Sequence, residues 1–162
     1  MPAGALLDRY SCGGAYADCY VTEIARTVSH AEYIEVFYTT WVFKLERLIL
    51  RWCVSRPSTD DEARELAAGK RDSFAAWTVE ARAADQLLLG DFSGRTKSWL
   101  MVSAIPGGTA GTRLYFGSAV VPARKVGGGR GGLGFVFTAL LGLHKLYSRI
   151  LLRSAAARLS QS

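Results

Sequence analysis

The stretch that decides the fold is residues 74–121, FAAWTVEARAADQLLLGDFSGRTKSWLMVSAIPGGTAGTRLYFGSAVV. It contains four runs rich in apolar and β-branched residues, at 74–82, 86–92, 97–104 and 112–121. Short turn sequences separate these runs: Ala84-Asp85, Ser93-Gly94 and Pro106-Gly107-Gly108. Because antiparallel strands can be joined by such short turns, the stretch predicts a four-stranded antiparallel meander.

The residues before the meander predict one strand followed by helices. Residues 17–25 alternate as a strand does. Two capping boxes then predict helix starts, and these are Ser29 with Glu32 and Thr59 with Glu62. We expect His30, beside the first cap, to lie at the surface. The first helical region is long, and we expect it to break at residues 39–40, since two adjacent threonines are poor helix formers.

The residues after the meander predict a glycine-rich loop and a long helix. Residues 135–159 carry an apolar face and a polar face on which every charge is basic. Gly129 to Gly134 match the spacing of a dinucleotide-binding loop, but neither a second strand nor an acidic residue follows them. We therefore interpret this segment as a loop and expect no cofactor.

Composition indicates one domain, residues 1–162, with a substantial core, because 49% of the residues are hydrophobic and 21% are charged.

The net charge of +6 is unevenly distributed along the chain. All 14 acidic residues and 10 of the 20 basic ones precede residue 92, so the C-terminal half has no carboxylate side chain. Either the two halves offset each other's charge, or this half attracts an anionic membrane surface or protein partner. No nucleic-acid-binding module is recognisable, so we expect no nucleic acid partner.

Cysteine usage and hydropathy predict a cytoplasmic protein. The three cysteines form no C-x-x-C pair, and the N-terminus lacks the pattern of a signal peptide. The most apolar segment, residues 133–152, is interrupted by His144, Lys145 and Arg149. We therefore expect no transmembrane segment.

Eight side chains are candidates for binding a ligand. His144 and Tyr147 share a face of the last helix, where they suit either an acid–base pair or core packing. Arg82 and Arg113 suit contacts to a ligand if their side of the sheet is buried, and cross-strand ion pairs if it is exposed. The aromatic candidates, which otherwise pack the core, are Trp41, Trp77, Trp99 and Tyr115.

The order of elements, a strand, helices, a meander and a long final helix, resembles the helix-grip fold of START-like and polyketide-cyclase-like proteins (the SRPBCC superfamily). The segments GRTKSWL at 94–100, RLYFGSA at 113–119 and HKLY at 144–147 look like those of an uncharacterised bacterial family related to the DUF2867 group. The resemblance implies an α+β fold in which a curved antiparallel sheet packs around the C-terminal helix and encloses a hydrophobic cavity. About five strands are recognisable, where six or seven are usual.

Three functional hypotheses follow. The first is binding of a small apolar or amphipathic molecule between the sheet and the last helix. The second is an enzyme of the cyclase, isomerase or hydrolase kind that uses His144 with Tyr147 or Asp91, although no catalytic triad, paired-carboxylate motif or metal cluster is recognisable. The third is binding of an anionic membrane surface or protein through the basic C-terminal half. The sequence also permits a homodimer.

Overall fold

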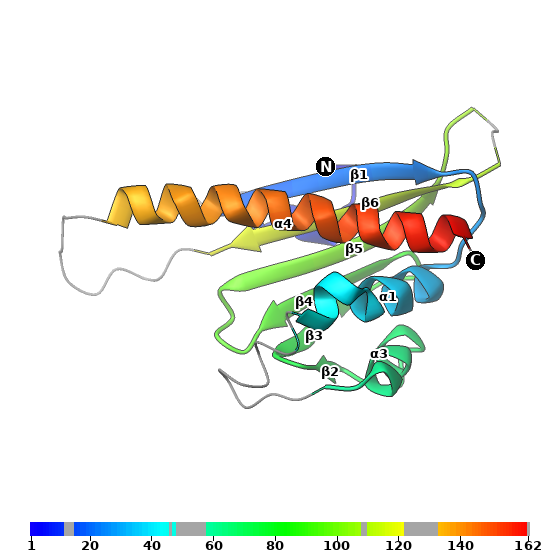
Figure 1. Ribbon diagram of the computed structural model, residues 1–162, viewed down its shortest axis with the longest axis horizontal. Coiled ribbons are helices and arrows are strands. Elements are labelled where there is room, and N and C mark those ends of the chain that lie inside the picture. The colour runs from blue at the N-terminus through cyan, green and yellow to red at the C-terminus, as the bar shows by residue number, and fades with distance from the viewer. Residues whose placement is uncertain (12–14, 46, 48–57, 108–109, 122–132, 162) are drawn as a thin grey trace.

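The computed structural model describes residues 1–11, 15–45, 47, 58–107, 110–121 and 133–161, with the backbone alone for 133–144. Six antiparallel strands form one curved sheet in the order β1-β6-β5-β4-β3-β2 (Figure 1). They are β1 (Tyr16–Ile24), β2 (Ser73–Phe74), β3 (Trp77–Arg82), β4 (Gln86–Asp91), β5 (Thr96–Ala104) and β6 (Thr112–Val120).

Three α-helices cover one face of this sheet, which we call the helix-covered face. They are α1 (His30–Thr39), α3 (Asp60–Ala67) and α4 (Leu133–Gln161). The long α4 runs along β1 and β6, α1 lies beside it against β5, and α3 packs between α1 and β2 (Figure 1). The predicted α+β class, with a curved antiparallel sheet and a long C-terminal helix in a helix-grip-like arrangement, is confirmed.

The predicted elements correspond closely to those of the structure. The strand β2 was not recognised because two residues are too few to show an alternating pattern. The predicted strand at 74–82 begins three residues before β3, because Phe74 belongs to β2. The other strand ends agree within one residue, and α4 begins two residues earlier than predicted. The dinucleotide-loop segment at 129–134 lies largely outside the described residues.

Both predicted helix starts and the helix break are confirmed, but the reciprocal capping box forms only at Thr59. The Ser29 hydroxyl accepts the backbone N–H of Glu32, and Thr59 with Glu62 forms a reciprocal capping box. The helix α1 ends at Thr39, and residues 41–45 are helical again. The Thr40 hydroxyl bonds the Phe37 carbonyl and accepts the N–H of Phe43, so it competes with the regular helical pattern at the break.

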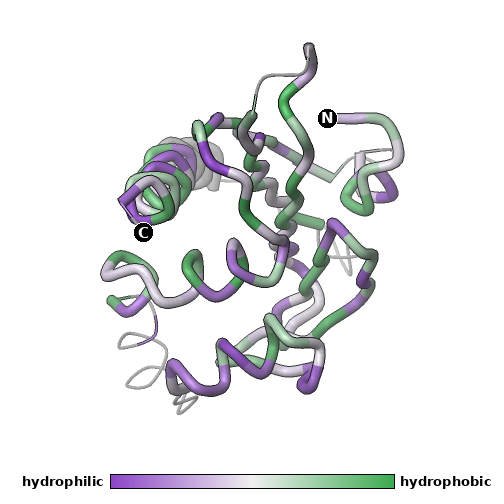
Figure 2. Tube along the Cα trace, turned by 90° about the vertical axis from the view of Figure 1, so that its right-hand side faces the viewer, coloured by the Kyte–Doolittle hydropathy of each residue, from purple (hydrophilic) through white to green (hydrophobic). Residues whose placement is uncertain are grey.

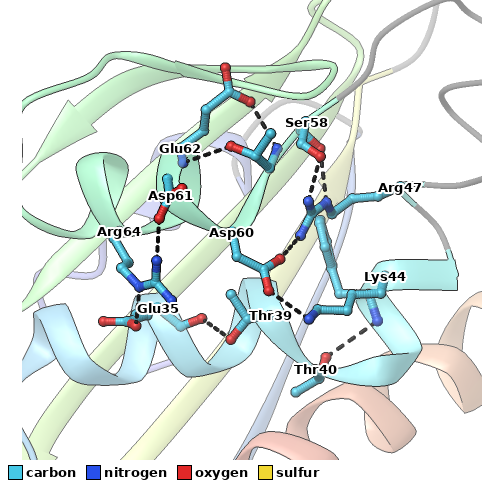
Figure 3. A network of polar contacts seen from close by, with 12 residues as sticks. Glu35, Thr39, Thr40, Lys44, Arg47, Ser58, Asp60, Asp61, Glu62 and Arg64 are labelled. Carbon is cyan, nitrogen blue, oxygen red and sulfur yellow. Dashed lines mark hydrogen bonds and ion pairs between the residues drawn. The ribbon is translucent and has the colours of Figure 1, made fainter.

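A polar network fixes α3 against α1 and the residues that follow it (Figure 3). The Asp60 carboxylate accepts hydrogen bonds from Lys44 and Arg47, both at 2.6 Å. On the same side, Arg64 bridges Asp61 of its own helix and Glu35 of α1. Burial raises the pKa of Asp60, but the bonds from the two cations outweigh it, so the pKa lies below its usual value.

The core on the helix-covered face is rich in aromatic side chains. Phe37 of α1 packs on Phe116 of β6 with ring centroids 4.9 Å apart, and Tyr38 packs on Phe43 at 4.8 Å. Leucines of the central strands and of α4 complete this core, and they are Leu87, Leu89, Leu100, Leu114, Leu151, Leu152 and Leu159.

The opposite face of the sheet, which we call the outer face, is covered by the N-terminal segment, residues 4–10. This segment contains the short 3₁₀ helix η1 (Leu6–Tyr10) and lies across the sheet from α4 (Figure 2). Leu7 is fully buried there against a second core cluster that includes Leu88 and Trp99. At its end, the Tyr10 hydroxyl donates to Glu80, which also pairs with Lys97.

The buried side chain of Gln86 holds the N-terminal segment to the outer face. Its Oε1 accepts the indole N–H of Trp99 and the backbone N–H of Leu6, both at 2.9 Å. Its Nε2 donates to the Gly4 carbonyl at 3.2 Å. One glutamine therefore satisfies three polar groups that the fold takes out of water.

We expect Gln86→Met to lower the free energy of unfolding by about 2–4 kcal/mol, because it leaves the Trp99 and Leu6 N–H groups without an acceptor. The matched control is Gln161→Met at the exposed end of α4, which we expect to change stability by less than about 0.5 kcal/mol. Urea denaturation of both variants measures the difference. Equal stability of the two variants would contradict this role of Gln86.

His30, which we expected at the surface beside a helix cap, is only 9% exposed. Its Nε2 lies 3.3 Å from the Leu100 carbonyl oxygen. A carbonyl can only accept, so this nitrogen carries a proton and donates. Burial lowers the pKa of His30 to about 4, and the bond to Leu100 offsets only part of the effect. The surface prediction was wrong because the first turn of α1 packs against β5.

The His30 pKa makes stability depend on pH in a defined direction. The unfolded chain takes up a proton near its usual 6.5, whereas the folded protein does so only near 4, so stability falls as the pH drops between these values. We expect a loss of about 2 kcal/mol between about pH 8 and about pH 5 from His30 alone. The measurement is urea denaturation at both pH values for the wild type and for His30→Gln, which removes the titration. A parallel pH dependence of the two proteins would contradict the assignment.

Candidate functional site

A row of polar side chains crosses the helix-covered face beneath α4 and α1. Asp18 of β1 lies directly opposite Ser118 of β6, and Ser118 lies opposite Ser98 of β5. Directly paired residues point to the same side of a sheet, and Ser98 is also paired with the core residue Leu89. These three side chains, together with Tyr38 of α1, are called the polar row below.

The neighbouring positions on the same face are apolar or aromatic. Two residues further along each strand, the corresponding row consists of Tyr20, Phe116, Leu100 and Leu87. Polar side chains in the middle of such a surface are costly to bury unless they are hydrogen-bonded. The polar row satisfies this condition through its own contacts.

Asp18 is the acceptor at the β1 end of the row. One carboxylate oxygen accepts the Ser118 hydroxyl at 2.6 Å and the Ser118 backbone N–H at 3.2 Å. The other accepts the phenol groups of Tyr20 at 3.1 Å and Tyr16 at 3.3 Å. Four donors therefore converge on one half-buried carboxylate.

Ser98 and Tyr38 form the other end of the row. Tyr38 is 1% exposed and Ser98 is 7% exposed, and their hydroxyl oxygens lie 3.4 Å apart. The interaction joins α1 to β5, because Tyr38 reaches across the core to the sheet. The row thus runs from β1 to α1 and passes through two strands of the sheet.

The second half of α4 borders the row. The Arg149 guanidinium lies over the Tyr20 ring and the Lys145 ammonium lies over the Tyr16 ring, each 5.6 Å from the ring centroid. Between them, Tyr147 packs against the core, and the Ser148 hydroxyl is buried without a hydrogen-bond partner in the described part of the chain. This stretch of helix places two cations over the tyrosine rings whose hydroxyl groups donate to Asp18.

The electrostatic environment keeps the Tyr20 phenol protonated, so that it acts as a hydrogen-bond donor. Burial and the nearby Asp18 carboxylate raise the pKa of Tyr20 to about 12, although Arg149 acts in the opposite direction. The phenol is therefore protonated at neutral pH and donates to the carboxylate. Such an arrangement of hydroxyl groups around one acid suits recognition of a hydroxyl, carbonyl or amide group of a ligand.

Three of the predicted ligand-binding residues lie on the outer face, away from α4. Trp99 and Tyr115 belong to the core cluster under the N-terminal segment, and Arg113 forms an ion pair with Glu23. The prediction that they line a cavity beneath the last helix is corrected for this reason. Trp99 directly follows Ser98, and successive side chains in a strand point to opposite faces. The large ring therefore lies on the outer face, and the small hydroxyl lies on the helix-covered face, where it contacts Tyr38 of α1.

The remaining predicted residues are dispersed. Trp41 is 71% exposed after the end of α1, and Arg82 is exposed and donates to the Arg71 carbonyl at 3.5 Å. Trp77 packs against the helix-side core, and its indole nitrogen has no acceptor in the described part of the chain. Tyr147 packs against the helix-side core, whereas the side chain of His144 is outside the described residues.

Asp91, which we considered as a catalytic partner of His144, stabilises a turn. Its carboxylate accepts the backbone N–H groups of Arg95 and Thr96 and the hydroxyl of Ser93. These bonds hold the connection between β4 and β5. The enzymatic hypothesis with His144 and Tyr147 stays a prediction, but Asp91 has a structural role.

The polar row was missed by sequence analysis, which concentrated on large and charged side chains. The available indication was the position of Asp18, Ser98 and Ser118 within otherwise apolar strands. Their alignment depends on strand register, which the alternating pattern alone does not determine. Tyr38 could not have been added, because its contact spans 60 residues of sequence.

Comparison with known proteins identifies no relative: no family model, curated protein or solved structure matches the chain. Among the described helices, none is long and apolar enough to cross a membrane. The described residues also contain no group of three or more histidine, cysteine, aspartate or glutamate side chains that could hold a metal ion.

Proposed function

We propose that this protein binds a small amphipathic molecule between the sheet and α4. The polar group of the ligand contacts the polar row, and its apolar part packs against the aromatic side chains of the helix-side core. The observation that carries the proposal is the cross-strand alignment of Asp18, Ser118 and Ser98 on an otherwise apolar face.

The energetics of the row support this function. Apolar residues at positions 98 and 118 would pack on Leu89 and the helices without requiring any hydrogen bond. Hydroxyl groups at both positions require partners, and each buried group left without one costs about 1–3 kcal/mol. Ligand recognition explains why polar groups occupy positions where apolar ones would stabilise the fold better.

The row also supports selectivity for a ligand with a polar end. A ligand with a polar end can add hydrogen bonds to the buried hydroxyl groups of the row, whereas a fully apolar molecule would cover these groups without adding any. The basic groups of Lys145 and Arg149 at the edge of the row favour a polar end with negative charge. We infer that the ligand is amphipathic rather than a pure hydrocarbon.

Two further proposals concern the family of the protein and its location in the cell. We propose that the chain is a divergent member of the START-like helix-grip superfamily, on the basis of its strand order and its C-terminal helix. We also propose a cytoplasmic location, which the free thiol of Cys19 supports.

Native mass spectrometry of the protein as purified tests the binding function, followed by denaturation and identification of the released compound. We expect a stoichiometric amphipathic compound whose occupancy falls at least about fivefold in Ser98→Ala, because one hydrogen bond is lost. The matched control is Ser103→Ala, on the same strand but on the outer face, which we expect to keep full occupancy. Equal occupancy in both variants, or release of no compound, would count against the proposal.

A further inference from the structure

The helix α4 exposes a stripe of apolar and basic side chains on the side that faces away from the core. Leu146 is 56% exposed and Ile150 is 41% exposed, and they lie one helical turn apart. The exposed basic residues beside them are Lys145, Arg149 and Arg153. These five residues are called the α4 stripe below.

The stripe continues into an open groove between the end of α1 and α4. The groove has a volume of about 680 Å³ and a mainly apolar lining to which Trp41, Ile150 and Arg153 contribute. Trp41 is the most exposed of the large apolar side chains in the described residues, at 71%. Leu146, Ile150 and Trp41 together leave apolar surface in water that the fold does not use.

The charge of this surface is positive and is not offset by the helix itself. No acidic residue occurs anywhere in α4. In the described part of the chain, Arg153 forms no ion pair, and Lys145 and Arg149 contact aromatic rings rather than carboxylates. Lys44 in the groove, by contrast, is paired with the carboxylate of Asp60.

We propose that the α4 stripe and Trp41 dock onto the surface of an anionic lipid bilayer. The apolar side chains enter the headgroup region, where a tryptophan ring is favoured, and the basic side chains contact lipid phosphates. The helix lies along the surface and does not cross the bilayer. This inference goes beyond the proposed ligand site, because it concerns the exposed side of α4. Lys145 and Arg149 lie at the boundary between the two surfaces, since they also contact the tyrosine rings at the edge of the polar row.

Charge complementarity selects the bilayer over a second copy of the chain. In a symmetric dimer formed through this face, the α4 stripe of one copy would meet that of the other, and cations would face cations. An anionic lipid surface supplies both a negative potential and an apolar layer beneath it. Both properties match the composition of the stripe.

Vesicle co-sedimentation of the 162-residue chain tests the inference. The probes are vesicles of phosphatidylcholine with phosphatidylglycerol and vesicles of phosphatidylcholine alone. We expect binding to the anionic vesicles only, with a loss of at least about tenfold when salt rises from about 0.1 M to about 0.5 M.

Variants with matched controls identify the surface. We expect Arg153→Glu, and separately Leu146→Ser with Ile150→Ser, to weaken vesicle binding at least about fivefold each. The controls are Lys70→Glu and Phe92→Ser, which change exposed residues outside α4 and which we expect to bind normally. All these positions are exposed, and thermal unfolding of each variant confirms that it folds.

Tryptophan fluorescence provides an independent measurement of vesicle binding. We expect a blue shift on anionic vesicles that is lost in Trp41→Phe.

Three results would overturn the inference: binding to neutral vesicles as strong as to anionic ones, unchanged binding of the stripe variants, or absence of binding. A dimer that dissociates in the Leu146 and Ile150 variant, without vesicle binding, would also overturn it, because a second copy would then cover the face. None of these variants alters the polar row, so the outcome is independent of the ligand test.

Discussion

The register of β1, β6 and β5 is the constraint on which the candidate site depends. A slip of one residue would turn Asp18, Ser98 and Ser118 to the outer face and bring Trp99 beneath α4. Gly117 contributes to fixing this register, since a Cβ there would lie 2.7 Å from Leu7 and 2.9 Å from the Trp99 ring. The close packing of the outer face therefore places the polar row on the other face.

The two sides of the sheet consequently have different roles. The outer face is held by hydrogen bonds from Gln86 and by packing of the N-terminal segment, and these contacts are structural. The helix-covered face combines an aromatic core with a polar row that such a core does not require. The two sides of the helix α4 also differ, because its inner side completes the core while its exposed side is apolar and basic.

Much of the fold could be predicted from local patterns, because the turns of the meander, the Thr59 capping box and the break near Thr40 depend on residues close in sequence. The site could not, since it depends on contacts between distant residues. Trp99 and Tyr115 were chosen for their size, and nothing in their own strands determined which face the N-terminal segment would cover. The burial of His30 was missed for the same reason, because its partner is the carbonyl of Leu100 on a strand 70 residues away.

A crystal structure of the protein with its co-purified ligand is the most direct test of the central claim, that the polar row is a binding site. The account predicts non-protein electron density between the sheet and α4, with a polar atom of the ligand within hydrogen-bonding distance of the Ser98 or Ser118 hydroxyl. Density located only elsewhere on the molecule, with α4 packed directly onto Asp18, Ser118 and Ser98, would contradict it.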